Sequence, residues 1–198
     1  MKKENNDNFF KKYNIKWVVV ISLWTFIMAS ILNIITENLT TNLSIIPSFF
    51  ILLFIILIGI IFDIIGIAVT RADEKPFHSM ASKKIDEAKI AIKLIRNADK
   101  VSNFCNDVIG DISGIISGAV GANLIHKLSK IYDISNTLIF AILLTSLTAA
   151  FTVGGKAFGK SIALTNYEKI IFKMAKFLNF IEKYFKINLV KKSENKKD

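Results

Sequence analysis

The chain has 198 residues, of which 52% are hydrophobic, and it carries a formal net charge of +10. Its mean hydropathy of +0.45 arises from long apolar runs that alternate with lysine-rich segments, whereas a soluble domain interleaves the two kinds of residue. This pattern excludes an ordinary soluble globular protein and predicts an all-α integral membrane protein. The abundance of Asn, Ile and Lys indicates an AT-rich bacterial genome.

Four windows are long and apolar enough to cross the hydrocarbon layer, which takes about 20 residues of helix. They are 17–36, 48–70, 103–125 and 137–158. The first follows a basic arm, as a secretory signal does, but its apolar run exceeds the roughly 7 to 15 residues of a signal core, so we expect an uncleaved anchor. The third contains glycines, serines and two aspartates, and a re-entrant or fully packed segment is the alternative to a span there.

Basic residues gather in three parts of the chain and are absent from the loop 37–47 that follows the first window. Five lysines lie in the N-terminal arm, eight basic residues in 71–100 and nine in 165–198. Because basic loops stay on the cytoplasmic side, we expect a multi-pass protein of the cell membrane with both termini in the cytoplasm. The predicted organisation is a cytoplasmic basic arm (1–16), an N-terminal transmembrane helix (17–37), a transmembrane core (46–164), a juxtamembrane amphipathic helix (165–190) and a disordered tail (191–198).

Two further segments have the periodicity of amphipathic helices. After Pro76, apolar residues recur at steps of 3 and 4 over 79–100, with lysines on the other face, which predicts a cytoplasmic helix lying on the surface. Its apolar positions are Ile85, Ala88, Ile92 and Ile95. The segment 165–190 begins with a capping-box pattern, Thr165 to Glu168, and carries a lysine stripe. Such helices bind the headgroups of an anionic inner leaflet; a solvated face of a bundle helix is the alternative. No basic patch with interleaved aromatic residues lies outside them, so we expect no nucleic-acid partner.

Charged residues also stand inside the apolar windows, where an ionisable group costs several kcal/mol unless it is paired or hydrated. They are Asp63, Asp107, Asp111 and Lys156. Carboxylates, hydroxyls and carbonyls are the ligands of hard divalent cations, so one hypothesis is a cation pocket formed by Asp63, Asp111 and Ser113. In the other, Lys156 or Lys160 neutralises the carboxylates in a structural ion pair. Asp107 and Asp111 are one helical turn apart and are expected to share a face.

The remaining motifs predict packing rather than catalysis. Gly110, Gly114 and Gly118 form two small-xxx-small steps, which let a second helix approach closely. Cys105 is the only cysteine and is expected to pack in the interior. His78 and His126 are far apart and are expected at the surface. No hydrolytic or redox constellation is visible, so we expect no enzyme, and no cofactor apart from magnesium as a bound or transported ion.

Four blocks, in this order, carry a family resemblance: FDIIGIAVTRADEKPFHSMA from Phe62, AKIAIKLIRNADKVSN from Ala88, Ile109-Gly110-Asp111, and GKAFGKSIA from Gly155. Through them the chain resembles the transmembrane domain of the CorB/CorC and cyclin M (CNNM) family of magnesium and cobalt transporters. The resemblance implies three core helices, a cytoplasmic amphipathic helix, a juxtamembrane helix, a homodimer and divalent-cation transport. The regulatory CBS pair of full-length members is absent, so nucleotide-gated control is not expected from this polypeptide.

The chain departs from the family pattern at the cation-binding positions. Asp63 and Asp111 stand where the family has a serine and an asparagine, and Gly66 and Lys156 replace two of its glutamates. A divalent-cation transporter is therefore one expectation. A non-transporting membrane scaffold or regulator, in which Lys156 takes the place of the cation, is the other. A small pore-forming, holin-like protein is a third, which only the size and the basic tail favour.

Overall fold

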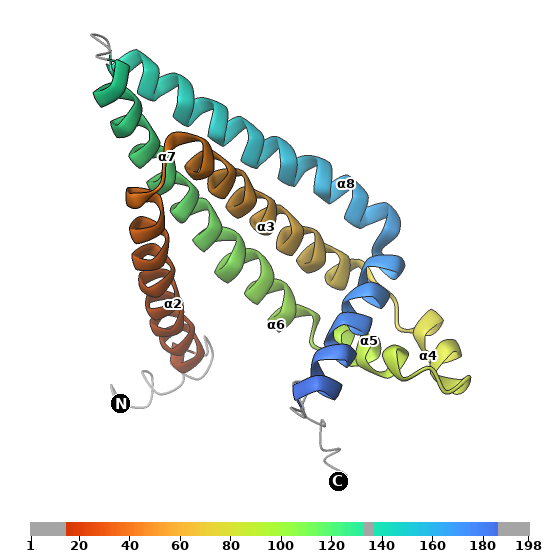
Figure 1. The fold of residues 1–198 in the computed structure, drawn as a ribbon. Coiled ribbons are helices and arrows are strands. Elements are labelled where there is room, and N and C mark those ends of the chain that lie inside the picture. The colour runs from red at the N-terminus through yellow and green to blue at the C-terminus, as the bar shows by residue number, and fades with distance from the viewer. Residues whose placement is uncertain (1–14, 133–136, 186–198) are drawn as a thin grey trace, which may run out of the picture. The chain divides into compact units, whose positions relative to one another are not determined.

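The computed structural model describes residues 15–132 and 137–185, and all regular structure within them is helical (Figure 1). The all-α prediction is therefore confirmed for this part of the chain. Except for Ile15 and Lys16, the predicted basic arm lies outside the described residues, as do the predicted tail and the last five residues of the juxtamembrane helix. Two compact units divide the chain: 1–55 with 114–148, and 56–113 with 149–198.

Four helical segments are long and apolar enough to cross a membrane, as the four windows predict. They are Val18–Asn42, Ile45–Arg71, Ala98–Ile131 and Leu138–Tyr184. The first two are the helices α2 (Ile15–Asn42) and α3 (Ile45–Arg71), and the last belongs to α8 (Thr137–Phe185). The third runs through three consecutive elements: α6 (Ala98–Asn103), the π-helical η1 (Phe104–Gly110) and α7 (Asp111–Tyr132). Length and composition thus identify a membrane protein.

Helix α2 ends later than its hydropathy indicates. It continues to Asn42, so the predicted loop 37–47 shrinks to Leu43 and Ser44. Polar side chains in its last turns bond to the helix itself: Asn38 Nδ2 donates to Ile34 O at 2.9 Å, and Asn42 Nδ2 donates to Asn38 O at 3.0 Å. A hydropathy window detects the apolar part of a helix, whereas the helix persists as long as its backbone groups remain paired.

The single amphipathic helix predicted over 79–100 is wrong. The segment forms α4 (Lys75–Ser82) and α5 (Asp86–Arg96), followed by α6. Pro76 lies in the first turn of α4, where its missing N–H breaks no bond. Lys84 takes a left-handed φ of 62° between the two helices, and its N–H donates to Ala81 O at 3.0 Å. This arrangement resembles the left-handed ending common at helix C-termini, here adopted by a residue other than glycine.

The apolar face of α5 is covered by protein, which corrects the prediction that this helix lies on the surface. It joins a core built from α3, α4, α5 and α8, with Ala68, Phe77, Ala91, Ile171 and Ala175 each fully buried. Burying a side chain as large as Phe77 contributes about 1.5 to 3 kcal/mol. The buried face of α5 is wider than the predicted apolar positions indicate, because Ile90 and Leu94 are buried as well.

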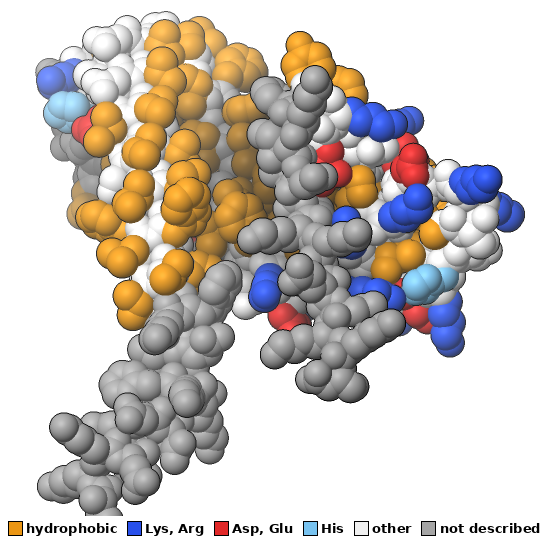
Figure 2. All heavy atoms as spheres, turned by 90° about the horizontal axis from the view of Figure 1, so that it is seen from below, with side chains coloured by type: hydrophobic (Ala, Val, Ile, Leu, Met, Phe, Trp, Pro, Cys, Tyr) orange, Lys and Arg blue, Asp and Glu red, His pale blue; other side chains and the backbone are white. Residues whose placement is uncertain are grey.

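Charged side chains occupy the opposite face of α4 and α5. Figure 2 shows basic side chains gathered there, with carboxylates among them. Glu74 accepts hydrogen bonds from Arg96 and from the His78 ring, each at 3.0 Å. Desolvation raises the pKa of Glu74, but these hydrogen bonds and the two positive partners outweigh it and lower the pKa below its usual value. Lys89 pairs with Asp86 at 3.0 Å on an exposed turn.

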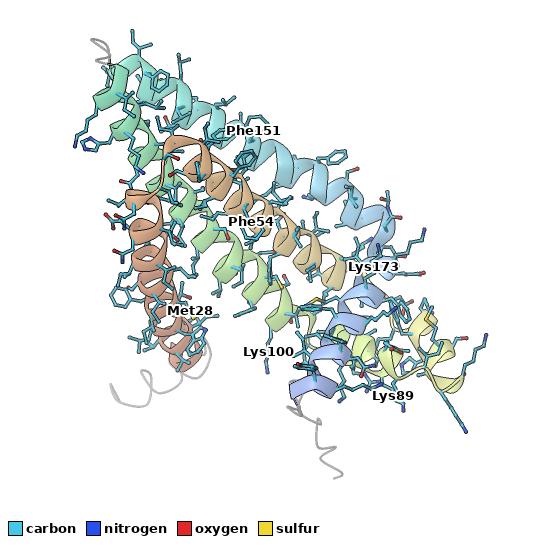
Figure 3. All side chains as sticks on the ribbon, viewed as in Figure 1. Met28, Phe54, Lys89, Lys100, Phe151 and Lys173 are labelled. Carbon is cyan, nitrogen blue, oxygen red and sulfur yellow. The ribbon has the colours of Figure 1, made fainter. Side chains whose placement is uncertain are left out.

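Helix α8 bends where the juxtamembrane helix was predicted to begin. The backbone leaves helical geometry at Asn166 (φ −123°, ψ 24°), one residue after the predicted cap. The Thr165 hydroxyl donates back to Ser161 O at 3.0 Å, and Asn166 Nδ2 donates to that hydroxyl at 2.9 Å. Beyond the bend, Ile171 and Ala175 enter the core, while the lysines remain exposed. Figure 3 shows Lys89 on α5 and Lys173 on α8 pointing away from the neighbouring helices.

Candidate cation site on α3, η1 and α8

Asp63 on α3 lies opposite Lys156 on α8. Their Oδ1 and Nζ atoms are 3.9 Å apart, and the two side chains are 17% and 28% exposed. A charge-assisted hydrogen bond between such groups is about 2.7 to 2.9 Å long, so the two charges attract without being hydrogen-bonded. Lys160, one turn further along α8, and Asp111 also act electrostatically on the Asp63 carboxylate.

The Lys156 amine rests against the end of η1. A Cβ atom built on Gly110 would lie 3.5 Å from Lys156 Nζ and 3.4 Å from Cys105 O. Because Gly110 has no side chain, the amine and two backbone segments meet in a small volume. Gly110 is buried, and its own carbonyl oxygen is 3.8 Å from a Cβ built on Gly59. The site therefore combines a carboxylate, an ammonium group and the backbone at the end of η1.

Asn106 contributes an oxygen atom without a partner. Its Oδ1 is buried and accepts no hydrogen bond from any residue that the structure describes. The amide lies directly against Gly66 of α3, where any Cβ atom would overlap it. An unpaired buried acceptor costs about 1 to 3 kcal/mol, so this oxygen is free to act as a ligand atom. The π-helical geometry of η1, a feature common at functional sites, sets the direction of this side chain.

Of the predicted site residues, Lys156 lies beside Asp63 and Gly110 beside Lys156, while Ser113 packs against α3 one turn away. Ser113 is buried at 7% exposure and packs against Gly59, with its Cβ 3.0 Å from a Cβ built on that glycine. Gly59, Asp63 and Gly66 recur at steps of 4 and 3 and so share one face of α3. Asp107 and Asp111 are both exposed. Among the described residues no group of three or more His, Cys, Asp or Glu side chains could hold a metal.

Close packing of helices involves glycines that the sequence analysis did not single out. Cβ atoms built on Gly155 and Gly159 of α8 would collide with Ile60 and Ile64 of α3. The nearest carbon of Ile64 is 2.7 Å from the Gly159 position. At Gly114, Gly118 and Gly121 a built Cβ would meet no described atom within 4 Å. Helix packing through Gly114 and Gly118 therefore stays a prediction about a second chain.

Asn106 was also missed, although its sequence carries a usable signal. An asparagine inside an apolar window needs a hydrogen-bond partner or a ligand, just as a carboxylate does. Gly66, one of the positions at which the family resemblance implied a departure, is the other half of this contact. What the sequence does not reveal is the π-helical stretch, which changes the facing of every residue in η1.

The model of one protein family, described as the cyclin M transmembrane N-terminal domain, matches residues 49–189. The chain belongs to the cyclin M family. This is a family of membrane proteins linked to magnesium transport, not a family of enzymes. No curated protein and no solved structure matches the chain.

Every residue of the candidate site lies inside the cyclin M domain, from Gly59 on α3 to Lys160 on α8. Helix α2 precedes the matched range and is an addition to it. The site therefore belongs to the part of the chain that defines the family. Any feature built on α2 requires its own explanation.

Proposed function

We propose that the protein is a divalent-cation transporter of the cyclin M type, with magnesium or cobalt as the ion. The observation that carries this proposal is the buried Asn106 Oδ1 without a donor. A cation would supply the missing partner and offset the cost of the unpaired acceptor. Family membership makes magnesium the first ion to test.

The donor set fits a partly hydrated ion. Magnesium needs one or two carboxylates, keeps several waters and accepts neutral oxygens. Asp63 offers a carboxylate, and Asn106 and the Gly110 carbonyl offer neutral oxygens. Asp111, at the first position of α7, and Ser113 would serve as outer ligands or through waters.

The second candidate function is a non-transporting membrane scaffold or regulator. Its support is the lysine itself, because Lys156 Nζ already lies 3.9 Å from Asp63 at a position where the family resemblance implies an acid. In that case the ammonium group neutralises the site and no ion enters. Pairing of this kind seldom adds stability over apolar packing, so it would be retained for a function.

The setting that we propose is the cell membrane, with both termini in the cytoplasm and the C-terminal half of α8 on the anionic inner leaflet. This half exposes Phe177, Phe180 and Tyr184, at 58%, 66% and 75%. Lys173, Lys176 and Lys183 are exposed beside them. Aromatic side chains flanked by lysines suit a headgroup region. A homodimer formed through the open glycines of α7 completes the proposal.

Asn106→Leu tests the transporter proposal, because it replaces the amide with an apolar side chain of similar size. We expect its melting temperature without ions to equal or exceed that of the unmodified protein, since an unpaired buried oxygen is gone. Added magnesium should stabilise the unmodified protein by about 2.7 kcal/mol at a hundredfold excess over Kd. Asn106→Leu and Asp111→Ala should lose this gain. Thermal unfolding in detergent measures both.

Asp99→Asn on the exposed surface of α6 is the matched control and should keep the full magnesium response. Equal magnesium stabilisation of Asn106→Leu, Asp111→Ala and the control would contradict the proposal. Flux of magnesium or cobalt into vesicles then separates transport from binding alone. Binding without flux would favour the scaffold or regulator.

A further inference from the structure

A second polar region lies in the other compact unit, where α2 meets α7 (Figure 1). A cavity of about 220 Å³ opens between the last turns of α2 and the middle of α7. Five of its eight lining residues are polar: Asn33, Thr36, Glu37, Thr40 and Asn123. Since α2 precedes the residues that match the cyclin M domain, family membership does not explain this cavity.

Hydrogen bonds between the two helices hold the walls of the cavity. Asn123 Nδ2 donates to Thr40 Oγ1 at 3.5 Å, and the fully buried Thr40 hydroxyl donates to Thr36 O at 2.8 Å. The Lys127 amine donates to Leu43 O at 2.6 Å and also to Thr40 O. A cation is favourable at these C-terminal carbonyls of α2. The cavity is therefore preformed rather than a gap between loose helices.

Two polar side chains of the lining have no partner. Neither the Asn33 amide nor the Glu37 carboxylate makes a hydrogen bond or an ion pair within residues 15–132 and 137–185. The Lys127 amine is bound to the carbonyls of Thr40, at the edge of the cavity, and Leu43. Glu37 is exposed and Asn33 is half-buried, so both side chains stay open to a ligand that enters the cavity. The hydroxyl oxygen of Thr36, which donates to Leu32 O at 2.7 Å, can still accept. The lining thus offers acceptor oxygens around one negative charge.

Size and position indicate what could fill the cavity. Glu37 lies five residues before the end of α2, about 7.5 Å along the axis at 1.5 Å per residue, so water can reach it from the membrane surface. Six waters at about 30 Å³ each need on the order of 180 Å³. The cavity of about 220 Å³ accommodates a hydrated magnesium ion, which binds through one carboxylate and keeps most of its waters.

We propose that this cavity binds a hydrated divalent cation, with the Glu37 carboxylate as its charged ligand and Asn33 and Thr36 holding its water shell. The site is separate from the one at Asp63 and does not depend on what happens there. It would give the additional N-terminal helix a function of its own, as a surface site that raises the local concentration of the ion.

Manganese is the probe, because electron paramagnetic resonance counts free and bound Mn²⁺ directly. The full chain is placed in nanodiscs of uncharged lipid, so that headgroups bind little of the ion. We expect Glu37→Gln to lose one bound Mn²⁺, and Asn33→Leu to weaken that site by about tenfold, as for other groups that orient metal ligands. Asp63→Asn should keep the Glu37-dependent ion. Glu168→Gln on exposed α8 is the control.

The same Mn²⁺ count and affinity in Glu37→Gln and Glu168→Gln would overturn the proposal. If Glu37→Gln does not fold, Asn33→Leu decides, because it keeps the carboxylate and a structural role alone predicts unchanged affinity. The experiment can refute either of the two proposed sites without refuting the other. A single Mn²⁺ that disappears with Glu37→Gln but not with Asp63→Asn would leave this inference standing and remove the one at Asp63.

Discussion

Lys156 is the residue that separates the two functions that we propose for the site. Its amine is 3.9 Å from Asp63 and close to Gly110, so a positive charge already occupies part of the volume that an ion would need. A tethered ammonium group differs from an ion because it cannot leave, but it can swing away on its flexible stem. Transport and permanent neutralisation therefore predict different behaviour when this charge is removed.

Lys156→Met alone should destabilise the protein if the lysine is a permanent partner, because Asp63 would be left without its counter-charge. Adding Asp63→Asn should then restore stability, with a coupling energy of about 0.5 to 3 kcal/mol between the two positions. Chemical unfolding of the two single variants and the double variant measures this coupling. Additive effects, together with stronger magnesium binding by Lys156→Met, would instead identify the lysine as a competitor of the ion.

At the scale of helices, two sets of glycines have opposite environments. On α8, Gly155 and Gly159 lie against Ile60 and Ile64, so α3 and α8 pack with little separation. On α7, a side chain at Gly118 would meet no described atom within 4 Å. Small residues at regular spacing therefore do not identify which face of a helix is already in use.

Gly159→Val and Gly118→Val form a matched pair. Gly159→Val should destabilise the protein by about 1 to 3 kcal/mol, because the added carbons overpack the contact with Ile64. Gly118→Val should leave the stability of a single chain nearly unchanged, since valine and glycine both have low helix propensities. Thermal unfolding gives the first comparison. Cross-linking in membranes gives the second, where Gly118→Val should reduce the dimer that we propose; equal losses of stability would contradict this account.

The bend at Asn166 and the break at Lys84 explain why α4, α5 and the end of α8 form a core instead of two separate surface helices. Each interruption redirects the chain by a local feature: a left-handed residue at Lys84 and a non-helical one at Asn166. Once redirected, α5 and the end of α8 bury each other's apolar faces together with α3 and α4. The aromatic side of this part of α8, with Phe177, Phe180 and Tyr184, stays exposed.

At the scale of the whole molecule, the four candidate spans predict that both ends of the chain lie on the same side of the membrane. The distribution of lysine and arginine predicts that this side is the cytoplasm. The same charge distribution predicts that the α2–α3 turn, and with it the cavity at Glu37, lies on the extracellular side.

Labelling of single cysteines tests this orientation in a Cys105→Ser background, where the buried native thiol is removed. With a membrane-impermeant maleimide, Asn42→Cys at the end of α2 should react in intact cells. Lys89→Cys, whose native side chain is 62% exposed on α5, should react only after lysis. The reverse pattern would show that the protein has the opposite orientation in the membrane. Labelling of both cysteine variants in intact cells would contradict the four spans.

Local patterns in the sequence were sufficient to predict the membrane class, the four apolar segments and the cyclin M family. They were also sufficient to select Asp63 and Lys156 as candidate site residues. These conclusions depend on composition and on residues that are near one another in the chain, and both can be read directly from the sequence. The length of α2, the break at Lys84 and the coverage of α5 were not accessible in this way, because backbone pairing and packing partners decide them.

The candidate site also has a part that the sequence predicted and a part that only the structure revealed. Its charges were visible in the sequence, since a carboxylate in an apolar run is conspicuous wherever the run folds. Its neutral half, Asn106 against Gly66, and the glycines of α8 became visible only in three dimensions. A π-helical stretch turned one asparagine inward, and the contacts of a glycine depend on which helix passes it.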